Sequence, residues 1–340
     1  MLAQPSPVSA ADALLDRVSL RSFDPGVMRQ SLQHGSVEHV QLEGGVFEGT
    51  VTHSASERLR VDWGRYNLPV QAKGSLSPDM LTVGLLLSGE GGWRTQGAAA
   101  DRGDMVLYAE GGELLVNLPA NAQWLAVQVS RQRLDALGIP LGRLRGASAW
   151  RLSAIPGEAG ADLSDVAPFL TPLHTSADAD ESHVQAAQEQ LFSLLFSEWE
   201  RRRAHIGLTA DKLDPGERLR VLRRAEAYIE SRSGVNCRVD EMCVAACTSL
   251  STLERVFREV YGVAPRRYLA LRRLAGVRNE LLNGDPGQSV TEIATRWGFF
   301  HLGRFAQEYS QLYHERPSQT KAAAAYPWFP ELSTRLAKSG

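Results

Sequence analysis

The sequence has few of the features that mark secreted, membrane-spanning or disulfide-stabilised proteins. Only three of its 340 residues are cysteines, an odd and small number that gives no disulfide framework. The longest apolar stretch, around Leu81–Leu87, is far shorter than the roughly 20 residues that cross a bilayer. The first 15 residues lack a basic start and an apolar run, so they do not resemble a secretory signal. We therefore expect a cytoplasmic protein without membrane contact.

Net charge is also small, but it is unevenly distributed along the chain. The whole sequence carries −2. Between Glu217 and Lys321, however, 17 basic residues stand against 12 acidic ones, which makes this segment +5 and leaves −7 for the remainder. A basic segment joined to an acidic one suggests that the basic part meets a polyanion. Because 340 residues exceed one usual compact core, we expect at least two domains.

The N-terminal part is predicted to be rich in β-structure. Residues 1–35 contain several prolines and serines and are expected to form a flexible lead. After them, short apolar runs of period two alternate with glycine-containing turns, a pattern typical of strands. Seven such runs favour a sandwich or a small barrel. The runs are Val37–Leu42, Val46–His53, Leu59–Tyr66, Met80–Ser88, Asp104–Ala109, Glu113–Leu118 and Gln123–Ser130.

Helical segments complete this β-rich domain, which we place at residues 36–206. A short helix is predicted over Arg131–Leu137, followed by a pair near Leu163–Leu173 and over Ser182–His205. The last segment carries an apolar stripe, which packs either on its own domain or on a partner subunit. Packing on its own domain is the favoured reading. Because one helix can do both, we also predict a homodimer through the stripe, whose members are Val184, Ala187, Leu191, Leu194 and Leu195.

The C-terminal part is predicted to be entirely helical. A polar linker at residues 207–216 precedes it, the helical domain occupies residues 217–325, and a tail follows at 326–340. Glycine, proline and serine positions divide the periodic segments from one another. The predicted helices start at Glu217 (ending near Ser233) and then cover Val239–Ala246, Ser249–Tyr261, Pro265–Leu282, Val290–Trp297 and Leu302–Tyr313.

An internal repeat is the most informative feature of the chain. A short helix, a turn and a longer helix occur twice, and the apolar positions that would lock the second helix across the first are shared. The outward positions differ between the two copies, as expected for two DNA-contacting helices that recognise different base pairs. Val239, Glu241, Met242, Leu253, Phe257, Val260, Tyr261 and Pro265 match Val290, Glu292, Ile293, Phe305, Tyr309, Leu312, Tyr313 and Pro317.

Residues Glu217–Ala322 resemble the AraC/XylS family of bacterial transcription regulators. The string from Leu253 to Tyr268 (LERVFREVYGVAPRRY) is similar to that family's first recognition helix and the start of its linker helix. The string from Ser289 to Phe299 (SVTEIATRWGF) resembles its second scaffold helix and turn. The segment His301–Tyr309 is most similar to the branch that contains ethanolamine-utilisation regulators.

Three positions depart from the pattern of that family. Cys247 stands where a turn glycine is usual, so a left-handed backbone there would be strained. Ser251 replaces a long or aromatic side chain that usually contacts a base. His314 replaces the glycine that usually precedes the closing Pro317.

The resemblance implies an α+β protein with a cupin-like β-barrel or sandwich, a helical hairpin and an all-α domain with two helix-turn-helix units. The two recognition helices would read successive major grooves of promoter DNA. We expect an activator at the nucleoid, with RNA polymerase as a further partner. The expected base contacts are Ser251, Glu254, Arg255, Gly303, Arg304 and Gln307. The expected phosphate contacts are Arg258, Arg266, Arg267, Arg272 and Arg296.

The β-rich domain would, by the same resemblance, sense a small-molecule effector. Aromatic side chains with two arginines could line its pocket, although ordinary core and surface packing is the alternative reading. The candidate pocket residues are Arg60, Trp63, Tyr66, Trp93, Arg94, Tyr108 and Trp124.

Neither a cofactor nor a metal is expected. Cys243 and Cys247 have a spacing that could share a metal, but no further ligand stands nearby, which favours small buried residues. His34, His39 and His53 are scattered rather than clustered. We therefore interpret the chain as a regulator and not an enzyme. Two alternatives remain, namely a metal-dependent cupin-type enzyme with a helical appendage and a non-specific nucleic-acid-binding protein.

Overall fold

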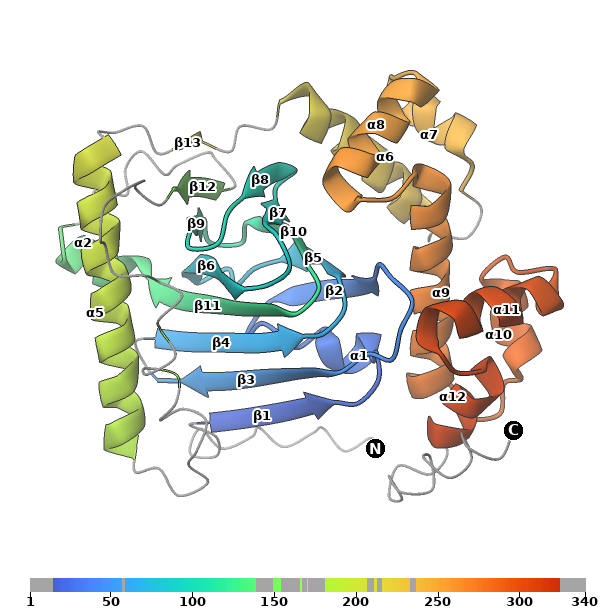
Figure 1. Ribbon diagram of the computed structural model, residues 1–340, viewed down its shortest axis with the longest axis horizontal. Coiled ribbons are helices and arrows are strands. Elements are labelled where there is room, and N and C mark those ends of the chain that lie inside the picture. Colours follow the sequence, from blue (N-terminus) through green and yellow to red (C-terminus); the bar gives the residue numbers. More distant parts are fainter. Residues whose placement is uncertain are drawn as a thin grey trace, which may run out of the picture.

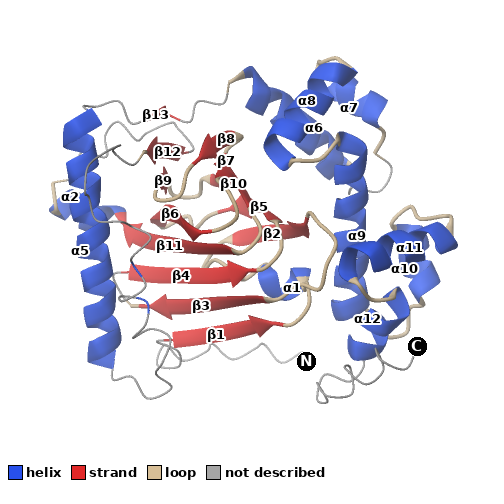
Figure 2. Cartoon of the chain, viewed as in Figure 1, coloured by secondary structure: helices blue, strands red, loops and turns tan. Residues whose placement is uncertain are grey.

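A computed structural model describes residues 15–56, 59–138, 149–153, 166, 170, 181–206, 211–212, 216–232 and 237–324. Figure 1 shows two halves, with β-sheets between the long helix α5 (Glu181–Ile206) on one side and a group of shorter helices on the other. Strands and helices are separated in the same way in Figure 2. This arrangement confirms the expected fold class, a β-rich sandwich followed by a helical domain.

The described strands form two sheets in which every neighbouring pair is antiparallel. The larger sheet has the order β1 (Leu15–Leu20), β3 (Gly49–Ala55), β4 (Leu59–Tyr66), β11 (Ala122–Ser130), β6 (Met80–Ser88), β9 (Met105–Tyr108), β12 (Ala149–Leu152) and β13 (Asp211–Lys212). The smaller sheet has the order β2 (Ser36–Gln41), β5 (Val70–Ser75), β10 (Glu113–Leu118), β7 (Trp93–Thr95) and β8 (Ala98–Ala100).

Strand β11 shows why the central strands of the larger sheet are apolar on both faces. Successive side chains of a strand point to opposite sides of its sheet. Trp124 and Ala126 face the smaller sheet and join the core between the two sheets. Leu125 and Val127 face the other way and join a second core beneath α5. Because α5 covers the outer face, no solvated face interrupts the apolar run.

The helical half consists of α6 (Glu217–Ser231), α7 (Val239–Ala245), α8 (Leu250–Tyr261), α9 (Pro265–Asn283), α10 (Val290–Arg296), α11 (Leu302–Tyr313) and α12 (Pro317–Ala324). The six helices predicted there all lie within two residues of their expected ends, as does the short α2 (Arg131–Ala136) of the β-rich half. No helix among the described residues is both long enough and apolar enough to cross a membrane. Helix α9 joins the two helix-turn-helix units.

The sequence prediction was wrong for part of the N-terminal lead. Residues 15–20 form β1, which pairs with β3 along its full length, and Pro25–Met28 form the short helix α1. The strands β5, β7 and β8 were also missed, because β7 and β8 have only three residues each and glycines within or beside all three weaken the period-two pattern. The short strands β12 and β13 were missed as well, and β13 lies within the predicted linker at residues 207–216. The predicted helix near Leu163–Leu173 lies almost entirely outside the described residues.

The two halves share one continuous apolar core on the side of α9 and α11. Phe23 stacks on Tyr313 with ring centroids 6.1 Å apart, and Phe47 and Val40 belong to the same cluster as Leu274 and Leu312. The side chain of Gln41 donates a hydrogen bond to the Leu312 carbonyl at 2.9 Å. The β-rich half is therefore packed on the helical half rather than merely tethered to it.

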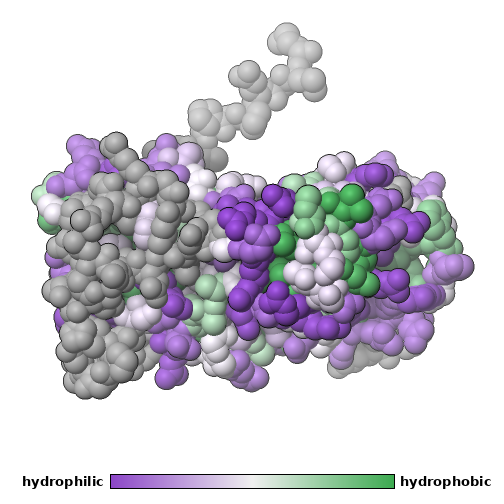
Figure 3. All heavy atoms as spheres, turned by 90° about the horizontal axis from the view of Figure 1, so that it is seen from above, coloured by the Kyte–Doolittle hydropathy of each residue, from purple (hydrophilic) through white to green (hydrophobic). Residues whose placement is uncertain are grey.

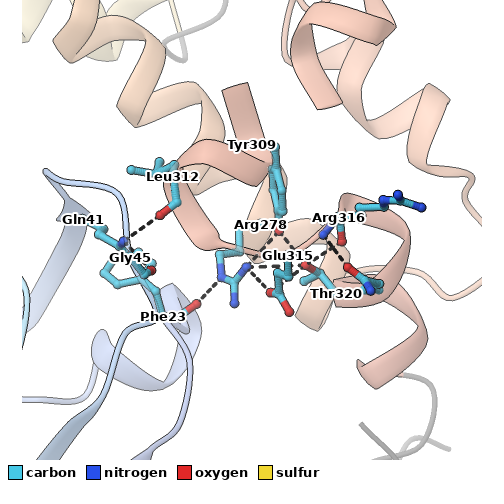
Figure 4. Close-up of polar contacts among 10 residues, drawn as sticks. Phe23, Gln41, Gly45, Arg278, Tyr309, Leu312, Glu315, Arg316 and Thr320 are labelled. Atoms are coloured by element: carbon cyan, nitrogen blue, oxygen red, sulfur yellow. Dashed lines mark hydrogen bonds and ion pairs between the residues drawn. The ribbon is translucent and has the colours of Figure 1, made fainter. Parts of the chain in front are cut away.

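The buried Arg278 on α9 is the polar centre of this contact (Figure 4). Its Nε donates to the Phe23 carbonyl, across the boundary between the halves. Its Nη1 donates to the Tyr309 hydroxyl at 3.1 Å and pairs with the Glu315 carboxylate at 2.5 Å. Because a buried charge is costly unless it is paired and hydrogen-bonded, these partners explain why arginine is tolerated there.

Candidate nucleic-acid interface

The first helix-turn-helix unit consists of α7, a four-residue turn and α8. Ser249 caps α8, since its hydroxyl accepts a hydrogen bond from the Thr252 amide at 3.2 Å. Met242 on α7 and Leu253 and Phe257 on α8 are fully buried in one cluster. These contacts hold α8 across α7, as the shared apolar positions of the repeat predicted.

The second unit, α10 with α11, is built in the same way. Ser289 and Glu292 form a reciprocal capping box that fixes the start of α10. Ile293 packs with Phe305 and Tyr309 of α11 in a single buried cluster. Gly298 in the turn has a φ of 78°, and Cys247, its counterpart in the first unit, has a φ of 52°. The strain expected at Cys247 is therefore present, and His314 is in the same region with a φ of 53°.

The six predicted base-contacting residues all lie on the outer sides of α8 and α11. Ser251, Arg255, Gly303, Arg304 and Gln307 are exposed, and Glu254 is half-buried. Arg304 pairs with Glu308 at 2.7 Å, and Arg255 pairs with Glu259 at 3.3 Å, one helical turn further on. Because exposed pairs of this kind contribute little free energy, these arginines can exchange their partners for DNA at small cost.

Four of the five predicted phosphate contacts are exposed cations. Arg258, Arg266, Arg267 and Arg296 belong to this set. Arg296 on α10 donates a hydrogen bond to the Gln288 side chain at 2.5 Å and lies 3.6 Å from the Glu280 carboxylate of α9. Their placement leaves these four side chains available to a polyanion.

Arg272 requires a correction. Its guanidinium binds Glu226 of α6 at 2.9 Å and Glu38 of β2 at 3.0 Å, and its side chain is only 18% exposed. Lys73 of β5 also reaches Glu226 at 2.9 Å. Burial alone would raise the pKa of the Glu226 carboxyl, but the charges of Lys73 and Arg272 hold it below its usual value. Arg272 is thus committed to the contact between the two halves and does not face a phosphate.

The apolar stripe of α5 lies on its own domain. Val184, Ala187, Leu191 and Leu195 are buried against the outer face of the larger sheet, and Leu194 is partly buried there. The structure therefore agrees with the interpretation favoured from the sequence, in which α5 packs on its own domain. The same side chains cannot also form the predicted dimer interface, because the sheet already covers them.

The predicted effector pocket is only partly assembled. Tyr66, Trp93, Tyr108 and Trp124 line a cavity of about 60 Å³ between the sheets. Trp63 lies on the opposite face of β4, in the core beneath α5. Arg60 hydrogen-bonds Ser77 at 3.4 Å, and neither it nor Arg94 lines the cavity. Trp63 and Tyr66 are three residues apart in one strand, so period two places them on opposite faces; the prediction grouped them by residue type alone.

Two residues that the sequence prediction missed, His39 and Thr82, add polar groups to this cavity beside those of the predicted Tyr66 and Trp124. His39 Nδ1, Thr82 Oγ1, Tyr66 OH and Trp124 Nε1 are buried without a hydrogen-bond partner. Burial lowers the pKa of His39 to about 4, so its ring is neutral at neutral pH. Among the described residues, no three His, Cys, Asp or Glu side chains come together in a way that could hold a metal ion. Cys243 is half-buried and Cys247 is exposed.

Comparison with known proteins finds a matching domain model and relatives in sequence for the helical half. Residues 242–323 match a family model described as a helix-turn-helix domain. The probable thc operon regulatory protein of Rhodococcus erythropolis is 37% identical over 100 residues, which are 29% of this chain and 30% of that protein. The XylDLEGF operon transcriptional activator 1 of Pseudomonas putida is 34% identical over 114 residues, covering 32% and 34% respectively. The chain thus spans about a third of the length of these relatives.

Similar solved structures carry related descriptions. The AraC-like transcriptional activator CuxR aligns with 78% of this chain and 96% of its own, at 16% identity and a TM-score of 0.38. The DNA-binding domain of AdpA, solved with a target DNA, aligns with 32% of this chain and 96% of its own, at 25% identity and a TM-score of 0.29. The repeat, the matched helix-turn-helix model and the relatives in sequence agree that the helical half is a DNA-binding helix-turn-helix domain similar to those of bacterial operon regulators.

Proposed function

We propose that this chain is a sequence-specific DNA-binding transcription regulator in which α8 and α11 read successive major grooves. The repeated helix-turn-helix unit, with both recognition helices presenting exposed polar side chains, is the observation that carries the proposal. A recognition helix places its N-terminal residues on base edges while the preceding helix contacts the backbone.

The length of the connecting helix supports this reading. Helix α9 has 19 residues, which corresponds to about 28 Å at 1.5 Å per residue. One turn of B-DNA is about 34 Å long. A connecting helix of this length therefore allows α8 and α11 to enter successive major grooves on one face of the duplex. In this arrangement Arg304 would donate two hydrogen bonds to a guanine, Gln307 would pair with an adenine, and Glu254 would accept from a cytosine.

The role of the β-rich half is part of the same proposal. The cavity between its sheets has aromatic walls and unpartnered polar atoms, the combination found in small-molecule sites. At about 60 Å³ it must widen before it can hold an effector. We also propose a homodimer through a surface other than the stripe of α5, and a cytoplasmic protein that acts at the nucleoid without enzymatic activity.

The names of the relatives favour activation over repression. The Pseudomonas putida protein is a transcriptional activator by name, and its similarity to this chain lies in the DNA-binding domain. On this basis we propose that the chain activates a promoter together with RNA polymerase.

Selection from a random-sequence duplex library with the purified full-length protein tests the function. We expect enrichment of one site with two conserved elements about one helical turn apart. Recovery of DNA without any shared sequence would instead indicate a non-specific nucleic-acid-binding protein. Metal analysis of the same preparation separates the regulator from a metal-dependent cupin-type enzyme, which would contain stoichiometric metal.

A further inference from the structure

Exposed apolar side chains gather at the start of both recognition helices. Leu250 is the first residue of α8 and is 53% exposed, and Leu302 is the first residue of α11 and is 40% exposed. Phe300, in the turn just before α11, is 73% exposed. Figure 3, which looks onto the end of the helical half that carries α7 and α8, shows hydrophobic side chains there within a hydrophilic border.

The repetition of this feature distinguishes it from ordinary surface composition. Single exposed apolar residues are common on proteins and need no explanation. Leu250 and Leu302, however, follow the capping residues Ser249 and His301 at equivalent points of the two units. Neither side chain is needed to hold its helix, because the buried Leu253 and Phe305 perform that function.

The position of the two leucines determines what could cover them. The first turn of a recognition helix lies closest to the base edges in the major groove. Hydrogen-bond donors and acceptors line that edge of DNA, and the C5 methyl of thymine is its apolar group. A leucine without hydrogen-bonding groups therefore finds a favourable partner in the groove only at thymine. The exposed cations Arg258 on α8 and Arg296 on the scaffold helix α10 supply the attraction to phosphate that brings this edge to DNA.

We propose that Leu250, Phe300 and Leu302 read thymine methyl groups, Leu250 in one major groove and the other two in the next. This inference rests on the proposed function, and it adds a recognition mode that the polar candidates on α8 and α11 do not supply. Burying one methylene-sized group is worth about 0.8 kcal/mol, which corresponds to about a fourfold change in affinity per methyl.

The test removes the methyl group from the DNA and then the side chain from the protein. The probe is the duplex selected by the full-length protein, with each thymidine replaced singly by deoxyuridine, which keeps base pairing and loses only the methyl. We expect two groups of thymines, about one helical turn apart, at which the native protein loses about fourfold in affinity. Leu302→Ala and Phe300→Ala should abolish the loss in one group, and Leu250→Ala in the other.

Val244→Ala is the matched control. Val244 is 79% exposed in the same domain but lies on the scaffold helix α7, so this variant should keep the full response to deoxyuridine. The inference is overturned if the native protein tolerates every deoxyuridine, or if the losses persist unchanged in the three variants. In that case the apolar side chains serve a protein partner. Failure of the proposed function looks different, because no shared sequence would then be selected at all.

Discussion

At the scale of single residues, two non-glycine positions carry backbone strain in the described part of the helical half. Cys247 and His314 have φ values of 52° and 53°, in the left-handed region that L-residues avoid. The left-handed conformation costs a non-glycine residue about 1–2 kcal/mol, which a glycine at the same position would not lose. Glycine also has more freedom in the unfolded chain, and this offsets about 0.5–1 kcal/mol of the stability gained by the replacement. We predict that Cys247→Gly and His314→Gly each raise the free energy of unfolding by about 0.5–1 kcal/mol.

Urea denaturation checks this prediction. Cys247→Ala is the control, because it removes the thiol but keeps the Cβ atom that causes the strain. Equal stabilisation by alanine and glycine would show that the thiol, and not the backbone, is unfavourable at this turn.

A second residue-scale prediction separates base contacts from phosphate contacts. Arg304 is 78% exposed on the outer side of α11, whereas Arg296 lies on the scaffold helix α10. Arg304→Ala should cost about 1–3 kcal/mol on the selected site and flatten the preference at one or two base pairs. Arg296→Ala should weaken all sequences equally and lower the salt slope by about one. Titrations against single-base variants of the site at several salt concentrations measure both effects. A parallel loss on every sequence with Arg304→Ala would make it a phosphate contact.

At the scale of elements, local pattern predicted the helices well and the strands less well. Caps such as Ser249 and Ser289 and the buried repeat positions are local signals, so the helix bounds followed from the sequence. The strand β5 was missed because Gly74 lies near its end, where a Cβ atom would meet the Ser36 carbonyl oxygen of β2 at 1.9 Å. Period two places Trp63 and Tyr66 on opposite faces of β4, but it does not show which face meets which core, and the predicted pocket collected aromatic residues without regard to face.

The stripe of α5 illustrates the same limit of a one-dimensional pattern. An apolar stripe shows that a helix face is covered, but not whether a sheet or a second subunit covers it. Since Leu191 is fully buried on the larger sheet, we predict that Leu191→Ala lowers the free energy of unfolding by about 2–5 kcal/mol and leaves the oligomeric state unchanged. Denaturation and sedimentation of the same samples measure the two quantities, with the exposed Gln190→Ala as control. A monomeric variant of native stability would instead restore α5 as the dimer interface.

At the scale of the whole molecule, contacts between the halves were beyond sequence reasoning because they join residues distant in the chain. Arg272 was taken for a phosphate contact, and Arg278 received no role. Both are held by partners, Glu38 and Phe23, that lie more than two hundred positions away. Clustered arginines on a helix show where positive charge lies, but their partners depend on how the two halves pack.

The network around Glu226 predicts an acid-sensitive contact. The pKa of its carboxyl is lowered in the folded protein, so its stabilising contribution is present above the unfolded value of about 4.5 and is lost as pH falls through the folded value. Glu226→Gln should therefore destabilise the protein at pH 7 and differ progressively less from the native protein at more acidic pH. Thermal unfolding of both proteins between pH 7 and pH 3 measures this difference in stability. The exposed Glu217→Gln is the control, and a difference that is constant with pH would contradict the ionic origin.

The fragment from Leu213 to Gly340 tests how far the helical half depends on the β-rich half. It contains both recognition helices and the basic segment, so we predict that it binds the selected duplex alone, with affinity that falls steeply with salt. It should also unfold at a lower temperature, because α9 loses the apolar residues that share its core. Gel shift and thermal unfolding measure these effects. A folded fragment that binds only when the β-rich half is added would contradict the predicted autonomy.

The contact between the two halves lies on the helix that separates the two recognition helices. Helix α1 and strand β2 pack on α9, and α9 is the element that fixes the distance between α8 and α11. The first residues of both recognition helices remain exposed while the β-rich half is in place. A displacement of β2 would thus move or bend α9 and change the separation of α8 and α11, but it would leave the exposed side chains at the start of both recognition helices unchanged. Regulation through this contact would change which separation of the two DNA elements the protein prefers, while the preferred bases within each element stay the same.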